Sequence, residues 1–267
     1  MTIFYKQSTQ PFHFKEEKHQ TQATRIGPYH LEKKIAHGAT SSLYLANSLK
    51  KRNVAIKVLC PGNEEIEPYF LKEGDLLQKL SHPNIVQFYR QGSFEKGHYI
   101  AMEYIEGKSL DQFLLKNELF SIRAALEITL QTAYALFYLH SQDIIHKDVK
   151  PENIILSPSH TVKLIDFGTA EKIHEQRKEP VQGTPAYMSP EHKANLAIPS
   201  SDLYSLGVVA YELLTHRLSY GKIHLDALPK SVRPIIETAT KPNPEDRFQD
   251  VSAFILAISE TLFQLAT

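Results

Sequence analysis

Four side chains that could take part in proton or phosphate chemistry lie close together near the middle of the chain. Asp148, Lys150 and Asn153 are neighbours, and Asp166 follows after a short apolar stretch. An aspartate can accept a proton, a lysine can neutralise an anion, and carboxylate and amide oxygens are ligands that a hard cation such as Mg²⁺ prefers. A polar turn with solvated charges would explain one or two of these residues, but not the whole ordered set.

Two short strands must position these side chains. The apolar runs 154–156 and 162–165 flank a Ser-Pro-Ser-His segment, and Ser and Pro favour a turn. Antiparallel pairing about that turn brings Asn153 to within about two residues of Asp166. The sequence therefore predicts a cation site at the open end of a hairpin, with Asp148 one short loop away.

The order of these residues resembles that of the protein kinases. HKDVKPEN at 146–153 and DFG at 166–168 match the catalytic loop H-R-D-L-x-x-x-N and the magnesium loop D-F-G of that family. The resemblance covers about residues 28–260 and is greatest to the compact eukaryotic-like kinases of bacteria. It implies an α+β, two-lobed protein kinase fold: a flexible tail (1–27), a small β-rich N-lobe with one key helix (28–105) and a larger, mainly helical C-lobe (106–267).

Lys57 lies in the apolar run Val-Ala-Ile-Lys-Val-Leu at 54–59, which reads as a strand. A buried ammonium without a partner is costly, so either Lys57 has an acidic partner or it points outward from an edge strand. The run resembles the kinase V-A-I-K, which implies that Lys57 orients the α and β phosphates of ATP and pairs with Glu73. A helix is expected around Glu73, ended by His82-Pro83. Acidic residues would introduce this helix, which is favourable for the helix dipole: Glu64, Glu65 and Glu67. The inward face of the helix would be apolar, with Phe70, Leu77 and Leu80.

Residues 36–41 read as a turn of small residues between strands at 29–35 and 42–46, where backbone N–H groups could approach phosphate oxygens. The match to the kinase loop G-x-G-x-x-G-x-V is partial, because Ala36 and Ser41 stand at two glycine positions. The resemblance implies that Met102 is the gatekeeper residue. The full set of implied ATP contacts is Ala36, His37, Gly38, Ala39, Thr40, Ser41, Leu43, Ala55, Lys57, Met102, Glu103, Ile105 and Ile155.

The second half of the chain is expected to be helical. Ser121 is a predicted N-cap of a long helix with an apolar face made of Ala125, Leu126, Leu130, Ala133, Leu136 and Phe137. A helix that begins at Asp202 is apolar on nearly all sides and should be buried. Between them, GTPAYMSPE at 183–191 resembles the G-T-P-x-Y-M-A-P-E segment of serine/threonine kinases. The resemblance implies that Thr184 bonds Asp148 and Lys150. It implies structural roles for His146, Phe167, Gly168, Glu191, Asp202 and Arg247, with Glu191 and Arg247 paired.

The family resemblance implies transfer of the γ-phosphate of ATP to a Ser or Thr hydroxyl of a protein. Asp148 would accept the hydroxyl proton, Lys150 would offset phosphate charge, and Asn153 and Asp166 would hold Mg²⁺. An inactive or weakly active scaffold of the same fold is the alternative, because the glycine loop is altered. A small-molecule phosphotransferase is disfavoured by the 183–191 segment and by Arg247.

Lys147 replaces the arginine of H-R-D. In many kinases that arginine binds the phosphorylated activation loop with a bidentate fork, which lysine cannot reproduce. Residues 170–182 also contain no Ser, Thr or Tyr. We therefore predict activity that does not depend on phosphorylation of this loop, with charged residues such as Glu179 ordering it instead.

Composition narrows the class of partner. The 267 residues carry 30 Lys plus Arg against 30 Asp plus Glu, a balance that argues against nucleic acid or an anionic membrane as partner. The single cysteine excludes an intramolecular disulfide and fits a reducing compartment. No signal peptide and no long apolar run are evident. We expect a cytoplasmic protein; the sequence does not indicate its oligomeric state.

Overall fold

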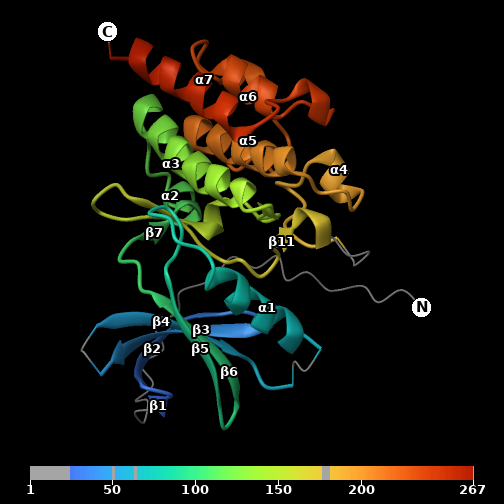
Figure 1. Cartoon of the computed structure of the whole chain (residues 1–267). Coiled ribbons are helices and arrows are strands. Elements are labelled where there is room, and N and C mark those ends of the chain that lie inside the picture. Colours follow the sequence, from blue (N-terminus) through green and yellow to red (C-terminus); the bar gives the residue numbers. More distant parts are fainter. Residues whose placement is uncertain (1–24, 50–51, 63–64, 176–180, 267) are drawn as a thin grey trace. The chain divides into compact units, whose positions relative to one another are not determined.

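The computed structural model describes residues 25–49, 52–62, 65–175 and 181–266, which form two compact units (Figure 1). The first unit comprises the chain up to Gln78 together with Phe88–Tyr104, and the second comprises Lys79–Gln87 and everything from Ile105 onward. The expected division at residue 105 therefore needs one addition: a segment of about ten residues after the first helix belongs to the second unit. No helix in the described ranges is long and apolar enough to cross a membrane.

A six-stranded antiparallel sheet, in the order β1-β2-β3-β4-β6-β5, makes up most of the first unit. Alternating apolar residues and β-branched side chains explain its strands. The strands are β1 (Arg25–Ile26), β2 (Tyr29–His37), β3 (Ser41–Ser48), β4 (Asn53–Leu59), β5 (Phe88–Phe94) and β6 (Gly97–Glu103). One helix, α1 (Glu67–Leu77), belongs to this unit.

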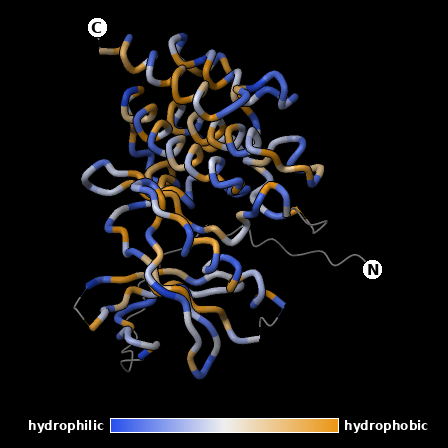
Figure 2. Tube along the Cα trace, in the orientation of Figure 1, coloured by the Kyte–Doolittle hydropathy of each residue, from blue (hydrophilic) through white to orange (hydrophobic). Residues whose placement is uncertain are grey.

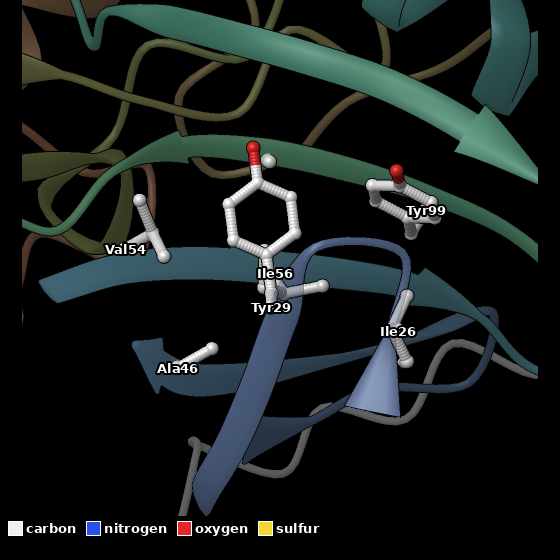
Figure 3. Close-up of a cluster of buried hydrophobic side chains, with 7 residues drawn as sticks. Ile26, Tyr29, Ala46, Val54, Ile56 and Tyr99 are labelled. Carbon is white, nitrogen blue, oxygen red and sulfur yellow. The ribbon is translucent and has the colours of Figure 1, made fainter. Parts of the chain in front are cut away.

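The strand register divides the side chains of this sheet between two faces. Residues directly opposite each other in an antiparallel pair point to the same face. One face holds an apolar core in which Tyr29 and Tyr99 meet edge to face, with ring centroids 6.1 Å apart (Figure 3). The remaining members of this core are Ile26, Ala46, Val54, Ile56 and Ala101. The opposite face is thereby left to the alternate residues of β3, β4 and β6.

The second unit is mainly helical, and α3 packs against both α5 and α7. Figure 2 shows hydrophobic and hydrophilic residues alternating along these helices, as packing on one side requires. The helices are α2 (Leu110–Leu115), α3 (Ile122–Ser141), α4 (Pro190–Lys193), α5 (Pro199–Thr215), α6 (Arg233–Ala239) and α7 (Val251–Gln264). The short strands are β7 (Lys108–Ser109), β8 (Ile144–Ile145), β9 (Ile154–Leu156), β10 (Val162–Leu164) and β11 (Glu171–Lys172).

The long helix α3 begins as predicted but packs differently at its C-terminal half. The hydroxyl of Ser121 accepts a hydrogen bond from the Ala124 amide at 3.1 Å, which confirms the N-cap. Phe137, expected on the buried face, is 49% exposed, so that assignment was wrong. Thr129 and Thr132 are buried there, because their hydroxyls donate to carbonyls one turn earlier in the helix and leave no polar group unpaired.

Several element boundaries differ from the expected ones. Strands β2 and β3 are longer than predicted, so that only residues 38–40 connect them. The Gly38 amide donates to the Ser41 carbonyl at 2.8 Å. Helix α1 ends at Leu77, well before His82-Pro83, which leaves Leu80 buried but outside the helix.

Two elements also begin earlier than expected. Helix α5 starts at Pro199 rather than at Asp202, because a proline at the first helical position needs no amide partner. Strand β1 pairs Arg25 and Ile26 with β2 in a stretch that was expected to belong to the tail. The turn between these strands contains Gly27 at φ +54°, a conformation that favours glycine.

Two leucines on helices of the second unit test where its core lies. Leu206 of α5 is fully buried, and Leu256 of α7 is 59% exposed. We expect Leu206→Ala to lower the free energy of unfolding by about 3 kcal/mol, because it removes buried methyl groups and leaves a cavity. Leu256→Ala should change it by less than about 0.5 kcal/mol. Chemical denaturation of both variants measures this, and equal losses would contradict the assigned core.

Candidate active site

The hairpin of β9 and β10 has the register that the sequence predicted. Leu164 pairs with Ile154, and the amide of Ile165 donates to the carbonyl of Asn153 at 2.9 Å. The turn is closed by the Ser157 amide, which donates to the Thr161 carbonyl at 3.0 Å. Asn153 thus lies opposite Ile165, and Asp166 is the next residue along the chain. The predicted meeting of these two segments at the open end of the hairpin is confirmed.

Asp148 is at the centre of a buried hydrogen-bond network. Its Oδ1 accepts a bond from the Thr184 hydroxyl at 2.8 Å. Its Oδ2 accepts from Lys150 Nζ at 2.7 Å and from Asn153 Nδ2 at 3.1 Å. Lys150 Nζ also donates to the Thr184 hydroxyl at 2.8 Å, which closes a ring of three residues. The contacts that the family resemblance implied between Thr184, Asp148 and Lys150 are therefore present in the structure.

The loop that carries Asp148 is held by a single buried carboxylate. Asp202, near the start of α5, accepts hydrogen bonds from the amides of His146 and Lys147, each at 2.9 Å. Its Oδ2 also lies 2.9 Å from His140 Nε2. Burial by itself would raise the pKa of Asp202, but the neighbouring His140 and the backbone donors lower it, so this carboxylate stays ionised.

His146 and Phe167 join the two segments of the site. Their rings meet edge to face with centroids 4.9 Å apart, and both side chains are almost completely buried. Burial lowers the pKa of His146, so its ring is neutral and serves packing. This buried ring contact anchors the polar loop that carries Asp148 to the segment that carries Phe167.

Charged groups around Asp148 alter one another's protonation. Burial alone would lower the pKa of Lys150, but the adjacent Asp148 more than offsets this and raises it. Lys150 therefore keeps its positive charge while it touches the carboxylate. The pKa of Glu152 is also raised, in this case by burial, but for a carboxyl group this favours the neutral form. Asp148 therefore faces a charged ammonium at Lys150, together with the hydroxyl and amide donors of Thr184 and Asn153.

The residues predicted to hold a metal ion have suitable chemistry for a hard cation. Asn153 uses its amide nitrogen to bond the Asp148 carbonyl at 2.9 Å, which leaves the amide oxygen as its ligand atom. Among the described residues, no group of three or more His, Cys, Asp or Glu side chains is arranged so that it could hold a metal ion by itself. Asn153 and Asp166 would therefore supply only part of a coordination shell. This fits Mg²⁺, which commonly takes one or two protein ligands and completes its shell with phosphates and water.

In the first unit, the predicted lysine–glutamate pair is formed. Lys57 Nζ lies 2.7 Å from both carboxylate oxygens of Glu73, and the side chains are 17% and 4% exposed. Lys57 sits on β4 and Glu73 on the buried side of α1, next to Leu77. The interpretation of Lys57 as an outward-facing lysine on an edge strand is wrong, because β4 lies between β3 and β6.

The expected nucleotide-binding residues of this unit gather on the sheet face opposite its apolar core. Register pairs Leu43 with Lys57 and Ala55 with Met102, so these four side chains share one face. The Glu103 side chain points to the other face, which suits a residue expected to act through its backbone. Of the remaining predicted contacts, Ile105 and Ile155 belong to the second unit, with Ile155 on β9.

The loop predicted to cover phosphate groups is shorter than expected. Of residues 36–41, Ala36 and His37 belong to β2 and Ser41 to β3, so only Gly38, Ala39 and Thr40 form the turn. His37 Nδ1 lies 2.8 Å from the hydroxyl of the buried Ser42, and that hydroxyl lies 3.7 Å from Cys60 Sγ. These side chains tie the base of the loop to β3 and to the end of β4.

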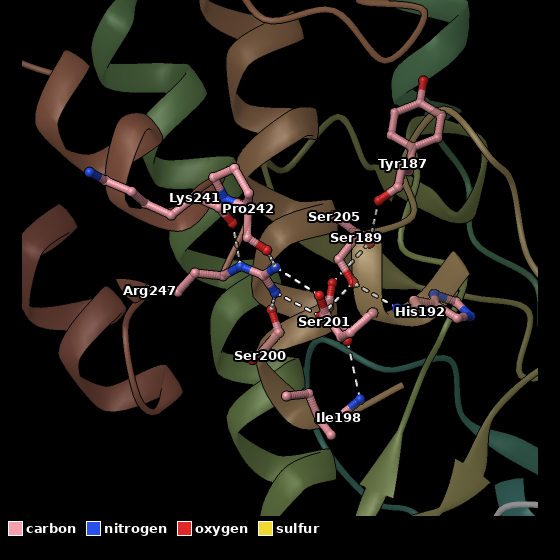
Figure 4. Close-up of polar contacts among 11 residues, drawn as sticks. Tyr187, Ser189, His192, Ile198, Ser200, Ser201, Ser205, Lys241, Pro242 and Arg247 are labelled. Atoms are coloured by element: carbon pink, nitrogen blue, oxygen red, sulfur yellow. Dashed lines mark hydrogen bonds and ion pairs between the residues drawn. The ribbon is translucent and has the colours of Figure 1, made fainter. Parts of the chain in front are cut away.

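Glu191 and Arg247 form an ion pair between distant segments of the second unit. Figure 4 shows Arg247 among Ser200, Lys241 and Pro242, whose backbone carbonyls it bonds. The guanidinium binds both carboxylate oxygens, at 2.7 and 2.8 Å, and lies over the Tyr204 ring at 5.0 Å. Its remaining donors bond backbone carbonyls of Lys241, Pro242 and Ser200, so all five N–H groups have a partner. This arrangement fixes the 183–191 segment to the helical core.

Two contacts of this unit were not anticipated from the sequence. Glu212, fully buried in α5, accepts hydrogen bonds from the Tyr187 hydroxyl at 2.9 Å and from the Ser219 amide. An acid within the otherwise uncharged stretch 206–214 of this helix is a signal that could have predicted such a partner. Lys147 pairs with Glu171, which nothing in the local sequence indicates. Glu179, named as an example of the charged residues expected to order the loop after DFG, lies outside the described residues.

These features together define the class of protein kinases. They are an antiparallel sheet with one helix, a helical second unit, and a network of Asp148, Lys150 and Thr184 next to Asn153 and Asp166. A family model described as the protein kinase domain matches residues 29–265, and the chain belongs to this family. The chain is 33% identical over 250 residues to the serine/threonine-protein kinase PrkC of Bacillus subtilis. The matched region covers 84% of this chain and 39% of PrkC. It is 32% identical over 254 residues to the serine/threonine-protein kinase PknB of Mycobacterium tuberculosis, covering 83% of this chain and 41% of that protein. The chain thus spans about two fifths of the length of these relatives.

The Glu191–Arg247 pair predicts a specific dependence of stability on pH. Burial alone would raise the pKa of Glu191, but hydrogen bonds from Arg247, Ser189 and Ser201 lower it to about 2, from an ordinary 4.5. The stabilisation is therefore complete above pH 4.5 and is lost as the pH falls toward 2. We expect Glu191→Gln to lower the free energy of unfolding by about 3 kcal/mol at pH 7, and the wild type and the variant to converge toward pH 2.

Glu127→Gln is the matched control, since Glu127 also faces an arginine, Arg123, but at 3.7 Å and with a side chain that is 52% exposed. Its effect should stay within about 0.5 kcal/mol at every pH, because exposed ion pairs contribute little. Urea unfolding between pH 2.5 and 7 measures both variants. A Glu191→Gln deficit that stays constant over this range would contradict the lowered pKa.

Proposed function

We propose that this chain is an active serine/threonine protein kinase domain that transfers the γ-phosphate of ATP to a Ser or Thr hydroxyl of a protein. The observation that carries the proposal is the closed network of Asp148, Lys150 and Thr184. It fixes a carboxylate, a cation and a hydroxyl on one small surface. The names of the relatives PrkC and PknB support the choice of Ser and Thr over Tyr.

Each residue of the network has a distinct part in this proposal. Asp148 accepts the proton of the attacking hydroxyl, and the donors around it hold the carboxylate in one orientation. Lys150, which keeps its positive charge next to Asp148, offsets negative charge on the transferred phosphoryl group. Thr184 ties the 183–191 segment to both, so that a substrate bound along this segment would present its hydroxyl to Asp148.

The first unit would bind the nucleotide. Lys57, held by Glu73, orients the α and β phosphates, and the amides of Gly38–Thr40 approach phosphate oxygens. Leu43, Ala55 and Met102 offer an apolar surface for adenine on the same sheet face. We propose Mg²⁺ as the metal, held by Asp166 and Asn153, where it would offset the charge of the phosphates.

An inactive scaffold remains the competing proposal, because two of three loop glycines are replaced. The intact Lys57–Glu73 pair and the Asp148 network argue for activity. A scaffold would need neither, and buried charged residues that serve no purpose destabilise a fold.

Transfer of labelled phosphate from Mg-ATP to a generic protein substrate tests the proposal. We expect label on Ser or Thr, and we expect Asp148→Asn to reduce the rate about a hundredfold or more, the usual contribution of a general base. Asp226→Asn, an exposed aspartate near Arg233, is the matched control and should have no effect. ATP binding without transfer in the wild type would favour the scaffold.

The metal assignment can be tested separately. Asp166→Asn removes a charged oxygen ligand, and we expect it to raise the Mg²⁺ concentration for half-maximal activity at least about tenfold, since even changes outside the ligand shell weaken metal binding 10–100-fold. The measurement is a Mg²⁺ titration of phosphate transfer at fixed ATP, with Asp226→Asn again as control. An unchanged Mg²⁺ requirement would remove Asp166 from the site.

A further inference from the structure

We propose that Glu171 is a built-in counter-charge for Lys147, which holds the catalytic loop in its working conformation without a phosphate group on the segment that follows. Lys147 Nζ lies 2.8 Å from Glu171 Oε2, with side chains only 14% and 10% exposed. Lys147 directly precedes Asp148 in the sequence, and the proposed effect of the pair rests on the kinase activity proposed above. Glu171 acts through Lys147 and is therefore a positioning residue.

Lys147 is a residue whose conformation has to be imposed by its surroundings. Its φ of +69° is in the left-handed region, which a lysine adopts only when contacts hold it there. The amide is bound by Asp202, and Gly183 approaches the Lys147 carbonyl so closely that a Cβ on that glycine would lie 2.7 Å from it. Glu171 provides the contact to the side chain. The start and the end of the segment 169–183 therefore both meet at Lys147.

Glu171 is carried by regular structure rather than by a loose loop. It belongs to β11, where Glu171 pairs with Ile145 and Lys172 pairs with Ile144 of β8. The amide of Ile173 donates to the Asp143 carbonyl at 2.8 Å, and the Thr169 hydroxyl donates to the His146 carbonyl at 3.0 Å. Strand pairing, together with the Thr169 bond before Glu171 and the Ile173 bond after it, therefore places the carboxylate beside Lys147.

The charges explain why a phosphate is not needed at this position. Lys147 carries one positive charge, which a single carboxylate already balances. A phosphate brought to the same place would face the Glu171 carboxylate, and like charges at this distance repel. Residues 170–182 contain no hydroxyl that could accept a phosphate. The structure thus supplies the charge itself, at the start of the segment, where modification cannot remove it.

Glu171→Gln tests this directly, because it keeps the size of the side chain and removes its charge. We expect kcat to fall about tenfold, the effect of losing one charge-assisted hydrogen bond, with the KM for ATP unchanged because Lys57 and Glu73 are untouched. In a Lys147→Gln background, Glu171→Gln should have little further effect, since the two residues act as one unit. Phosphatase treatment of the wild type should leave kcat unchanged.

Glu118→Gln is the control, because Glu118 pairs with Lys108 at 3.0 Å but both side chains are about two-fifths exposed. It should leave kcat and KM as they are. The inference is overturned if Glu171→Gln has wild-type kcat, if its effect is the same with and without Lys147, or if phosphatase lowers the activity of the wild type. A variant that merely unfolds more easily would show a lower unfolding temperature with an unaltered kcat below it.

Hydrogen exchange provides a reading that does not depend on catalysis. Amides of residues 146–150 should exchange faster in Glu171→Gln than in the wild type, while those of α5 keep their rates. A wild type that transfers no phosphate would defeat the proposed function, and the exchange data would still decide the role of Glu171. Unchanged exchange at 146–150 would overturn it.

Discussion

The buried carboxylate of Asp202 is the contact on which the site of the second unit depends. It lies in the first turn of α5, a helix that is buried along most of its length, and accepts hydrogen bonds from the amides of two consecutive loop residues. A loop of polar residues has no ladder of its own to satisfy its backbone. Asp202 accepts hydrogen bonds from the loop amides and is itself held by a helix, with His140 as a further partner. The position of Asp148 is therefore set by a helix more than fifty residues away in sequence.

The other buried charges of the molecule follow the same logic. Three of them are paired with an opposite charge carried by a different element: Lys57 with Glu73, Arg247 with Glu191, and Lys147 with Glu171. Such pairs add little net stability compared with apolar packing, but they are costly to break. They therefore specify which segments meet, and in what geometry, more than they stabilise the fold. In a protein whose proposed chemistry is positioning of charged groups, this specificity is the useful property.

Much of the candidate site could be predicted because its residues are close in sequence or belong to a recognisable pattern. The hairpin register followed from two apolar runs and a Ser-Pro turn, and the N-cap of α3 from one serine. The strand around Lys57 followed from its apolar neighbours. The predictions failed where packing rather than pattern decides. Phe137 fits a helical periodicity yet is 49% exposed, whereas Thr129 and Thr132 are buried, with hydroxyls that bond carbonyls of their own helix.

The sequence by itself determined the family, the order of the motifs and the chemical types present at the site, because these depend on residue identity and on short spacings. Only the tertiary structure decided that Lys147 pairs with Glu171, and that Glu212 meets Tyr187 and Ser219. Side chains of the same type compete equally in a sequence. What separates them is strand pairing and burial, such as the β8–β11 ladder that brings Glu171 to Lys147, and these arise only when distant segments pack together.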